Sequence, residues 1–167
     1  MSKTATQRAE RNRTITITDD EIELYRKNLV TLNSKTVEIS NKTIWQNTFE
    51  ALKLLPEKSF DLLFADPPYN LTKQFGENKF QQTSLDEYEI WLDSWLADCA
   101  KLLKNNASVY ICGDWRSASA IQRIGMKYFK LRNRITWERE KGRGANANWK
   151  NCAEDIWFFT VSDEFTF

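Results

Sequence analysis

The chain has 167 residues, a length that suits one domain with a core of moderate size. Its 24 basic and 23 acidic residues leave a formal net charge of +1, so bulk charge does not indicate a nucleic-acid partner and only local clustering can. Histidine is absent and the three cysteines form no CxxC pair, which excludes a histidine general base and argues against metal or disulfide sites.

The N-terminus is polar and basic, without the apolar stretch of a signal peptide, and no later run reaches the length of a membrane span. These features indicate a cytoplasmic protein with no membrane partner. We expect residues 1–17 to form a flexible segment and residues 18–167 to form one domain. Thr18 and Glu21 form a capping box, which predicts a short amphipathic helix with Ile22, Tyr25 and Leu29 on one face.

A second capping pattern, from Asn47 to Glu50, predicts a helix that Pro56 ends, because proline cannot continue the hydrogen-bond ladder. The segment Phe60–Ala65 is then almost continuously apolar. Because the polar and apolar residues do not alternate, it predicts a strand that is buried on both faces of a mostly parallel sheet.

A third capping box, Ser84 with Glu87, predicts a long helix that ends at a polar turn over Lys104–Asn106. Further elements are expected as a strand at Val109–Cys112, a helix at Ser117–Tyr128, and strands at Leu131–Trp137 and Ile156–Val161. Strands that alternate with helices indicate a right-handed α/β sheet. Four tryptophans fall on apolar faces and are expected in the core: Trp45, Trp91, Trp95 and Trp157.

The motif Asp66-Pro67-Pro68-Tyr69-Asn70 follows the apolar strand directly, at the strand end where open α/β sheets gather ligands. Two prolines end the ladder and make the chain leave the sheet rigidly, which holds Asp66 and Tyr69 in set directions. The alternative is a purely structural role, in which these residues form only a turn that ends the strand.

This motif suits the methylation of an exocyclic amine on a nucleobase. Asp66 and the Pro67 carbonyl can accept both N–H bonds, which frees the nitrogen lone pair for in-line attack on the methyl of a sulfonium donor. Tyr69 offers a stacking face, worth about 1–3 kcal/mol, against the few kcal/mol needed to flip a base. Attack at a cytosine ring carbon would need a cysteine beside a proline, and no proline here has one.

From about Ile44 to Phe167 the chain resembles amino-group DNA methyltransferases of the β arrangement, in which DPPY precedes the cofactor motif. The other motifs that carry the resemblance are Trp91–Leu103, Cys112–Trp115, Arg134–Trp137, Asn148–Asn151, Glu154 and Phe158-Phe159. The resemblance implies a Rossmann-like methyltransferase sheet. It also implies that Asp66, Pro67, Pro68 and Tyr69 are the catalytic residues, with S-adenosylmethionine as the methyl donor.

In that family an aspartate at the first motif position is typical of N6-adenine enzymes and a serine of N4-cytosine enzymes. Asp66 therefore favours N6 of adenine, and the resemblance implies an enzyme that protects DNA within a restriction-modification system. An N4-cytosine methyltransferase and a non-catalytic DNA-binding remnant remain the alternatives.

The cofactor is expected to contact Asn47, Thr48 and Asp66. The pair Gln46-Asn47 stands where the family usually has Gly-Asp, and Asn47 has a second interpretation as a helix N-cap. Basic residues cluster between Arg123 and Lys150. This cluster predicts a surface that contacts the phosphates of double-stranded DNA, and the alternative is that it forms an ordinary solvated loop. The DNA-binding candidates are Asn70, Lys141, Arg143, Asn148, Trp149 and Lys150, and Trp149 is alternatively a hydrophobic lid.

The glycine-rich cofactor loop, Phe-x-Gly-x-Gly between a strand and a helix, does not occur in the sequence. In the β arrangement it follows the target-recognition region, so we expect the sheet to be incomplete, without either part. The strand Phe60–Ala65 would then lack one neighbour and expose an apolar edge. This predicts either a complementing C-terminal half or self-association through that edge.

Overall fold

The computed structural model describes residues 16–35, 38–75, 78–143, 149 and 151–166. The N-terminal segment that was expected to be flexible falls mostly on residues 1–15, outside the described residues. No helix in the described part of the chain is long and apolar enough to cross a membrane.

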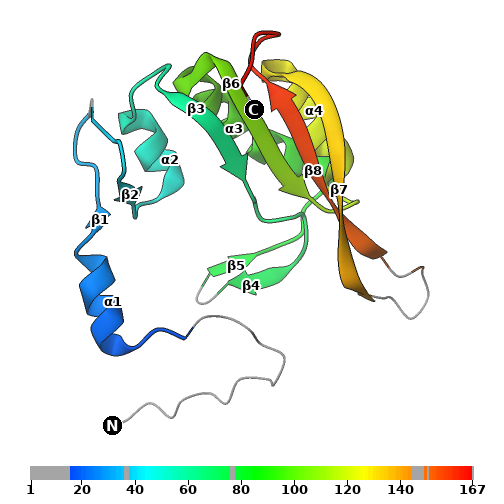
Figure 1. The fold of residues 1–167 in the computed structure, drawn as a ribbon. Coiled ribbons are helices and arrows are strands. Elements are labelled where there is room, and N and C mark those ends of the chain that lie inside the picture. Colours follow the sequence, from blue (N-terminus) through cyan, green and yellow to red (C-terminus); the bar gives the residue numbers. More distant parts are fainter. Residues whose placement is uncertain (1–15, 36–37, 76–77, 144–148, 150, 167) are drawn as a thin grey trace.

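A four-stranded sheet forms the centre of the molecule, in the order β3-β6-β8-β7 (Figure 1). Its strands are β3 (Phe60–Ala65), β6 (Leu103–Gly113), β7 (Lys130–Arg143) and β8 (Asn151–Thr160). Only β3 and β6 pair in parallel, whereas β8 is antiparallel to both β6 and β7. The prediction of a mostly parallel sheet is therefore wrong, because β7 and β8 follow each other in the chain and pair without a crossover helix.

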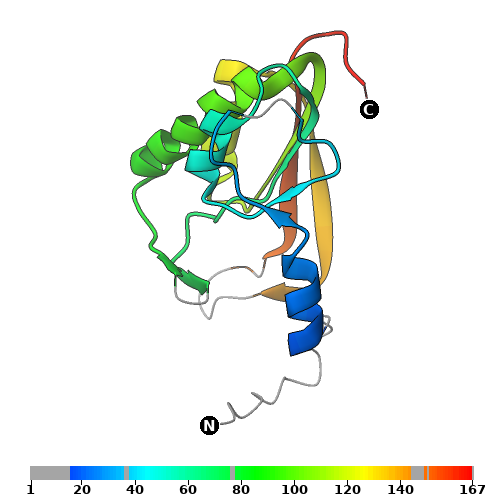
Figure 2. The same cartoon turned by 90° about the vertical axis from the view of Figure 1, so that its left-hand side faces the viewer.

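Both long helices lie on one face of this sheet: α3 (Leu85–Leu102) and α4 (Ala118–Tyr128) (Figure 2). The core forms between them and the sheet, where Leu92, Ile121, Val109, Ile111 and Phe159 are fully buried. Parallel β3 and β6 are joined through α3, which is the arrangement expected for an α/β unit. This half-sheet fits an incomplete Rossmann-like fold.

The start of α3 is as predicted, and its end is not. The Ser84 hydroxyl accepts from the Glu87 amide at 3.2 Å, and the Glu87 carboxylate accepts from the Ser84 amide at 3.0 Å. The expected turn over Lys104–Asn106 is absent, because β6 begins at Leu103, directly after the helix. These residues are polar because they lie at the exposed end of the strand, where Lys104 pairs with Asp61 of β3 at 2.7 Å.

The prediction that β3 is buried on both faces is also wrong. Leu63 and Ala65 pack against the core, but Leu62 and Phe64, on the opposite face, are 55% and 60% exposed. No described element covers that face, and no described strand pairs with the free edge of β3. The expected exposed apolar edge is thus present, together with an exposed apolar face.

The N-terminal part adds small elements beside the sheet: α1 (Asp19–Arg26), β1 (Leu29–Val30), β2 (Thr43–Ile44), α2 (Thr48–Ala51) and a 3-10 turn (Leu52–Leu54). The Thr18 capping box forms as predicted, but α1 buries none of its residues. Leu29 was expected on the helix and lies instead in β1, which pairs in parallel with β2.

One further expectation is corrected in this region, and the loop after β3 contains strands that the sequence did not predict. Trp45 is 68% exposed and lies outside the core, whereas Trp95 and Trp157 are buried as predicted, at 7% and 6%. A hairpin of β4 (Lys73–Phe75) and β5 (Asn78–Phe80) was not predicted, because each strand has only three residues and carries no apolar alternation.

Candidate active site

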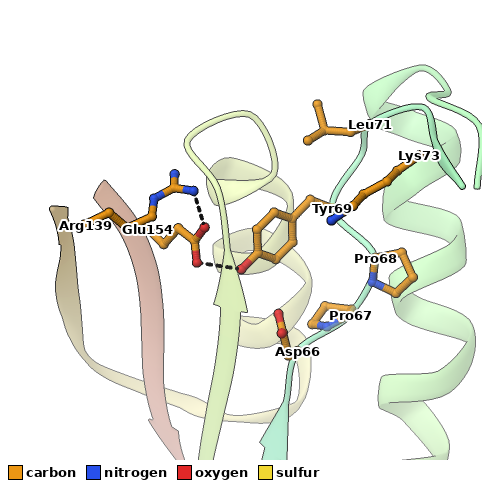
Figure 3. A pocket seen from close by; sticks show the side chains of 8 residues that line it. All are labelled: Asp66, Pro67, Pro68, Tyr69, Leu71, Lys73, Arg139 and Glu154. Atoms are coloured by element: carbon orange, nitrogen blue, oxygen red, sulfur yellow. Dashed lines mark hydrogen bonds and ion pairs between the residues drawn. The ribbon is translucent and has the colours of Figure 1, made fainter. Parts of the chain in front are cut away.

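The carboxyl end of β3 opens into a pocket of about 560 Å³ (Figure 3). Asp66, Pro67, Pro68 and Tyr69 leave the sheet here and form one wall. The hairpin region, β7 and β8 supply the remaining lining residues, which are Leu71, Lys73, Arg139 and Glu154. The four residues predicted to be catalytic therefore lie together at one open cavity.

Hydrogen bonds to Tyr88 and to Thr83 fix the orientation of the motif after β3. The hydroxyl of Tyr88, a fully buried residue of α3, donates to the Pro68 carbonyl at 3.0 Å. Asn70 donates to the Thr83 carbonyl and accepts from the Thr83 amide, both at 2.9 Å. Since Asn70 is only 6% exposed, its expected DNA contact does not fit, and its amide closes the loop that leads into α3.

The two proline carbonyls differ in their availability. Tyr88 occupies the Pro68 carbonyl, whereas no described residue donates a hydrogen bond to the Pro67 carbonyl. Asp66 is exposed, and none of the ion pairs in the described part of the chain includes it. The carbonyl of Pro67 and the carboxylate of Asp66, which also interacts with the Tyr69 hydroxyl, are therefore two acceptors beside the Tyr69 ring.

On the other side of the pocket, Tyr69 is tied to the paired strands β7 and β8 (Figure 3). Its hydroxyl donates to Glu154 Oε2 at 3.3 Å, and Glu154 Oε1 lies 2.7 Å from Arg139 Nη1. Arg139 Nη2 also donates to the Ala153 carbonyl at 3.3 Å. Glu154 thus joins the motif after β3 to a residue of β7.

The electrostatic environment keeps the neighbouring phenol and thiol neutral. Burial raises the pKa of Tyr69, and the charges of Asp66 and Glu154 raise it further. Burial likewise raises the pKa of Cys112, at the end of β6, with the same two carboxylates adding to the effect. At neutral pH, Tyr69 is a hydrogen-bond donor and Cys112 is a thiol.

The other predicted site residues do not line this pocket. Asn47 accepts from the Phe49 amide at 3.0 Å as the N-cap of α2, which supports its structural interpretation, and Thr48 is the first residue of that helix. Lys141 and Arg143 were expected in a flexible loop, but their backbone continues β7. Trp149 is 98% exposed, and Asn148 and Lys150 lie outside the described residues.

Sequence reasoning missed Arg139 and Glu154 as pocket residues. One signal was available, because Glu154-Asp155 interrupts the apolar composition of the strand that ends in Trp157, Phe158 and Phe159. A charged pair within a half-buried strand has to find partners. Which partners it finds depends on the register of β7 against β8, where Trp137 lies opposite Glu154.

Comparison with known proteins agrees with this geometry. The profile of the DNA methylase family matches residues 60–167. The Type II methyltransferase M.HpaI of Haemophilus parainfluenzae is 33% identical over 135 residues, which cover 77% of this chain and 42% of the relative. The DNA adenine methyltransferase YhdJ of Escherichia coli K12 is 36% identical over 86 residues, covering 52% and 29%.

Solved structures show the same fold. The cytosine-N4-specific PvuII DNA methyltransferase superimposes with a TM-score of 0.58 at 17% identity, covering 83% of this chain and 52% of that one. A protein of Thermus thermophilus, described as a DNA modification methylase and complexed with S-adenosyl-L-methionine, gives 0.55 at 18% identity, covering 72% and 53%.

The chain spans less than half the length of the two curated relatives. The part that matches the family profile includes the motif after β3, both long helices and all four strands of the sheet, since the matched region runs from Phe60 to Phe167. The match to this profile over more than half of the sequence confirms the resemblance: the chain belongs to the N6/N4 DNA methylase family.

Proposed function

We propose that the chain forms the base-binding half of a DNA methyltransferase that methylates N6 of an adenine flipped out of double-stranded DNA. The observation that carries this proposal is the arrangement at the end of β3. There, the Asp66 carboxylate, the unoccupied Pro67 carbonyl and the Tyr69 ring border one open pocket. S-adenosylmethionine, with which the Thermus thermophilus protein is complexed, would be the methyl donor.

The residues of the chain act on the acceptor amine. An adenine amine is a weak nucleophile because its lone pair is delocalised into the ring. Hydrogen bonds to Asp66 and Pro67 draw the nitrogen towards tetrahedral geometry and localise that pair. Tyr69 stacks on the flipped base and offsets part of the cost of unstacking, at about 1–3 kcal/mol per base.

Of the residues expected to meet the cofactor, Asp66 alone lies at the pocket. Its carboxylate would attract the sulfonium charge, and bound S-adenosylmethionine would supply an electrophilic methyl group. The described residues therefore provide the amine side of the reaction and one contact on the donor side.

We infer that a complementing polypeptide supplies the remaining cofactor contacts. The exposed face and free edge of β3, with Leu62 and Phe64 more than half exposed, support this inference. Self-association through the same edge is the competing outcome. The basic strand end at Lys141 and Arg143, together with Asn148, Trp149 and Lys150, would contact the phosphates of the bound duplex.

The test is the transfer of radiolabelled methyl to unmethylated genomic DNA, which presents every target sequence. The chain is assayed alone and with the C-terminal part of M.HpaI, beginning after the region aligned with this chain. We expect labelling in the mixture, its loss in Asp66→Ala, and its retention in Asp61→Ala, an exposed change on the same strand. Absence of label under both conditions would contradict the proposal.

An N4-cytosine activity is the second candidate, because the PvuII enzyme of the same fold is cytosine-N4-specific, whereas YhdJ is an adenine enzyme. Digestion of the labelled DNA to nucleosides decides between them. Label in N6-methyldeoxyadenosine supports the adenine assignment that Asp66 favours, and label in N4-methyldeoxycytidine replaces it.

A further inference from the structure

The hydroxyl of Tyr69 lies near two carboxylates, that of Asp66 in its own motif and that of Glu154 on a distant strand. It lies 3.3 Å from Oε2 of Glu154, a residue 85 positions later in the chain. A tyrosine ring is attached through two rotatable bonds, so a hydrogen bond at the far end restrains both the tilt and the position of the ring. The plane on which a base would stack is therefore set partly by β8.

Glu154 is itself held on the opposite side. Its other carboxylate oxygen, Oε1, lies 2.7 Å from Arg139 Nη1, and Arg139 is anchored to the Ala153 carbonyl at 3.3 Å. The side chains of Arg139 and Glu154 are 27% and 31% exposed, so water screens this pair only in part. Each carboxylate oxygen thus serves one partner, the guanidinium or the phenol.

The protonation state of the phenol favours this arrangement. Burial and the nearby carboxylates raise the pKa of Tyr69, so its hydroxyl keeps its proton and can only donate to a carboxylate. A donor that meets a charged acceptor makes a stronger hydrogen bond than two neutral groups do.

We propose that Glu154 is a positioning residue that holds the Tyr69 ring in the plane on which the flipped base stacks, with Arg139 holding Glu154. This inference rests on the proposed base-binding function and names residues that the DPPY motif does not contain. A ring already restrained in the free protein loses less freedom when the base arrives, so the tether favours binding.

The experiment measures the binding of adenosine and of cytidine to the full chain by NMR, with the ring carbons of tyrosine labelled. Free nucleosides make the test independent of the target sequence, of the cofactor and of the complementing half. Uridine, which lacks the exocyclic amine, is the negative probe. Amide spectra of each variant report whether the fold is intact.

We expect Glu154→Ala and Tyr69→Phe each to weaken the binding of the nucleoside by about threefold to tenfold, which lies within the range for losing one typical intramolecular hydrogen bond. Because both changes remove the same hydrogen bond, the double variant should bind no more weakly than either single variant. Glu154→Gln keeps one oxygen acceptor but loses the charge and the second acceptor, so its affinity should lie between those of the original protein and Glu154→Ala.

Asp163→Ala is the matched control, since Asp163 also forms ion pairs with β7, through Lys130 and Arg132, at the opposite end of the strand. It should leave the affinity unchanged. Unaltered affinity in Glu154→Ala, or additive losses in the double variant, would overturn the inference while leaving the pocket in place. Failure of the original protein to bind either nucleoside would instead contradict the proposed base-binding function.

Discussion

At the scale of single residues, Cys112 reports the charge in the pocket. Its pKa is raised by burial and then by the negative charges of Asp66 and Glu154. A thiol whose pKa is raised holds less thiolate at a given pH, and the thiolate is the form that alkylating reagents attack. The rate of alkylation of Cys112 therefore depends on whether Asp66 is charged.

We predict that Asp66→Asn increases the alkylation rate of Cys112 at pH 8, because removing one negative charge lowers the pKa of the thiol. The rate is measured with iodoacetamide, by quantifying each cysteine peptide by mass spectrometry. The other two cysteines are internal controls, since Cys152 is exposed and Cys99 is buried with its pKa raised to about 11.

Neither control should respond to Asp66→Asn: Cys152 should react quickly and Cys99 only after unfolding. An equal acceleration at all three cysteines would mean that the variant loosens the fold, and no acceleration at Cys112 would mean that Asp66 is distant from it in solution. This test also checks the pocket without reference to methyl transfer.

At the scale of elements, the same capping motif occurs in two helices with different consequences. The Ser84 box opens α3, which buries six residues in the core, whereas the Thr18 box opens α1, which buries none. The hydrogen bonds are alike in length, at 3.2 Å from each hydroxyl to the amide three residues later. The packing of the helix therefore decides what the cap contributes to global stability.

We predict that Ser84→Ala lowers the free energy of unfolding by about 1 kcal/mol, the usual effect of losing an N-cap. Thr18→Ala should leave the global transition unchanged, because fraying of an unpacked helix does not expose the core. Urea denaturation followed by tryptophan fluorescence measures both, since Trp91 and Trp95 belong to α3. Similar losses in the two variants would show that α1 packs against the domain in solution.

These caps show what sequence could predict of the fold. A capping box is local, so a pattern of four consecutive residues predicts the start of α3 and of α1 wherever these helices pack. The motif after β3 was equally local, because a strand followed by two prolines has to leave the sheet at that point. Its four pocket residues were predicted without knowledge of the strand order.

The missed features depend on contacts between distant segments. Two-sided burial of β3 was inferred from its composition, but burial requires another element over Leu62 and Phe64, and the described residues provide none. Glu154 reaches Tyr69 only because β8 inserts between β6 and β7, and the order of strands is not written in either segment. Composition indicates what a strand can bury, not what covers it.

At the scale of the whole molecule, α3 and α4 pack on one face of the sheet, and no described helix covers the opposite face, here called the bare face. Across the bare face, Phe64, Tyr110 and Phe158 form a row of stacked rings on neighbouring strands, with centroids 6.3 Å and 4.8 Å apart. Phe158 is buried, with Phe165 packed edge-on against it, whereas Phe64 is exposed. Ile135 and Trp137 of β7 extend the apolar surface and are 43% and 62% exposed. Contiguous apolar surface of this kind is typical of a surface that contacts another molecule.

We predict that Phe64→Ser lowers both the binding of the dye ANS and the apparent mass of the protein in light scattering at high concentration. The change should lower the free energy of unfolding by less than about 1.5 kcal/mol, because the ring is already 60% exposed. Leu63→Ser is the matched control, since its side chain packs against the core from the other face of the same strand. It should destabilise the protein by about 2 kcal/mol or more and increase dye binding.

If Phe64→Ser changed neither dye binding nor mass, the bare face would not be the surface through which the chain associates. Association would then have to be sought along the free edge of β3, where backbone groups rather than aromatic rings would make the contact.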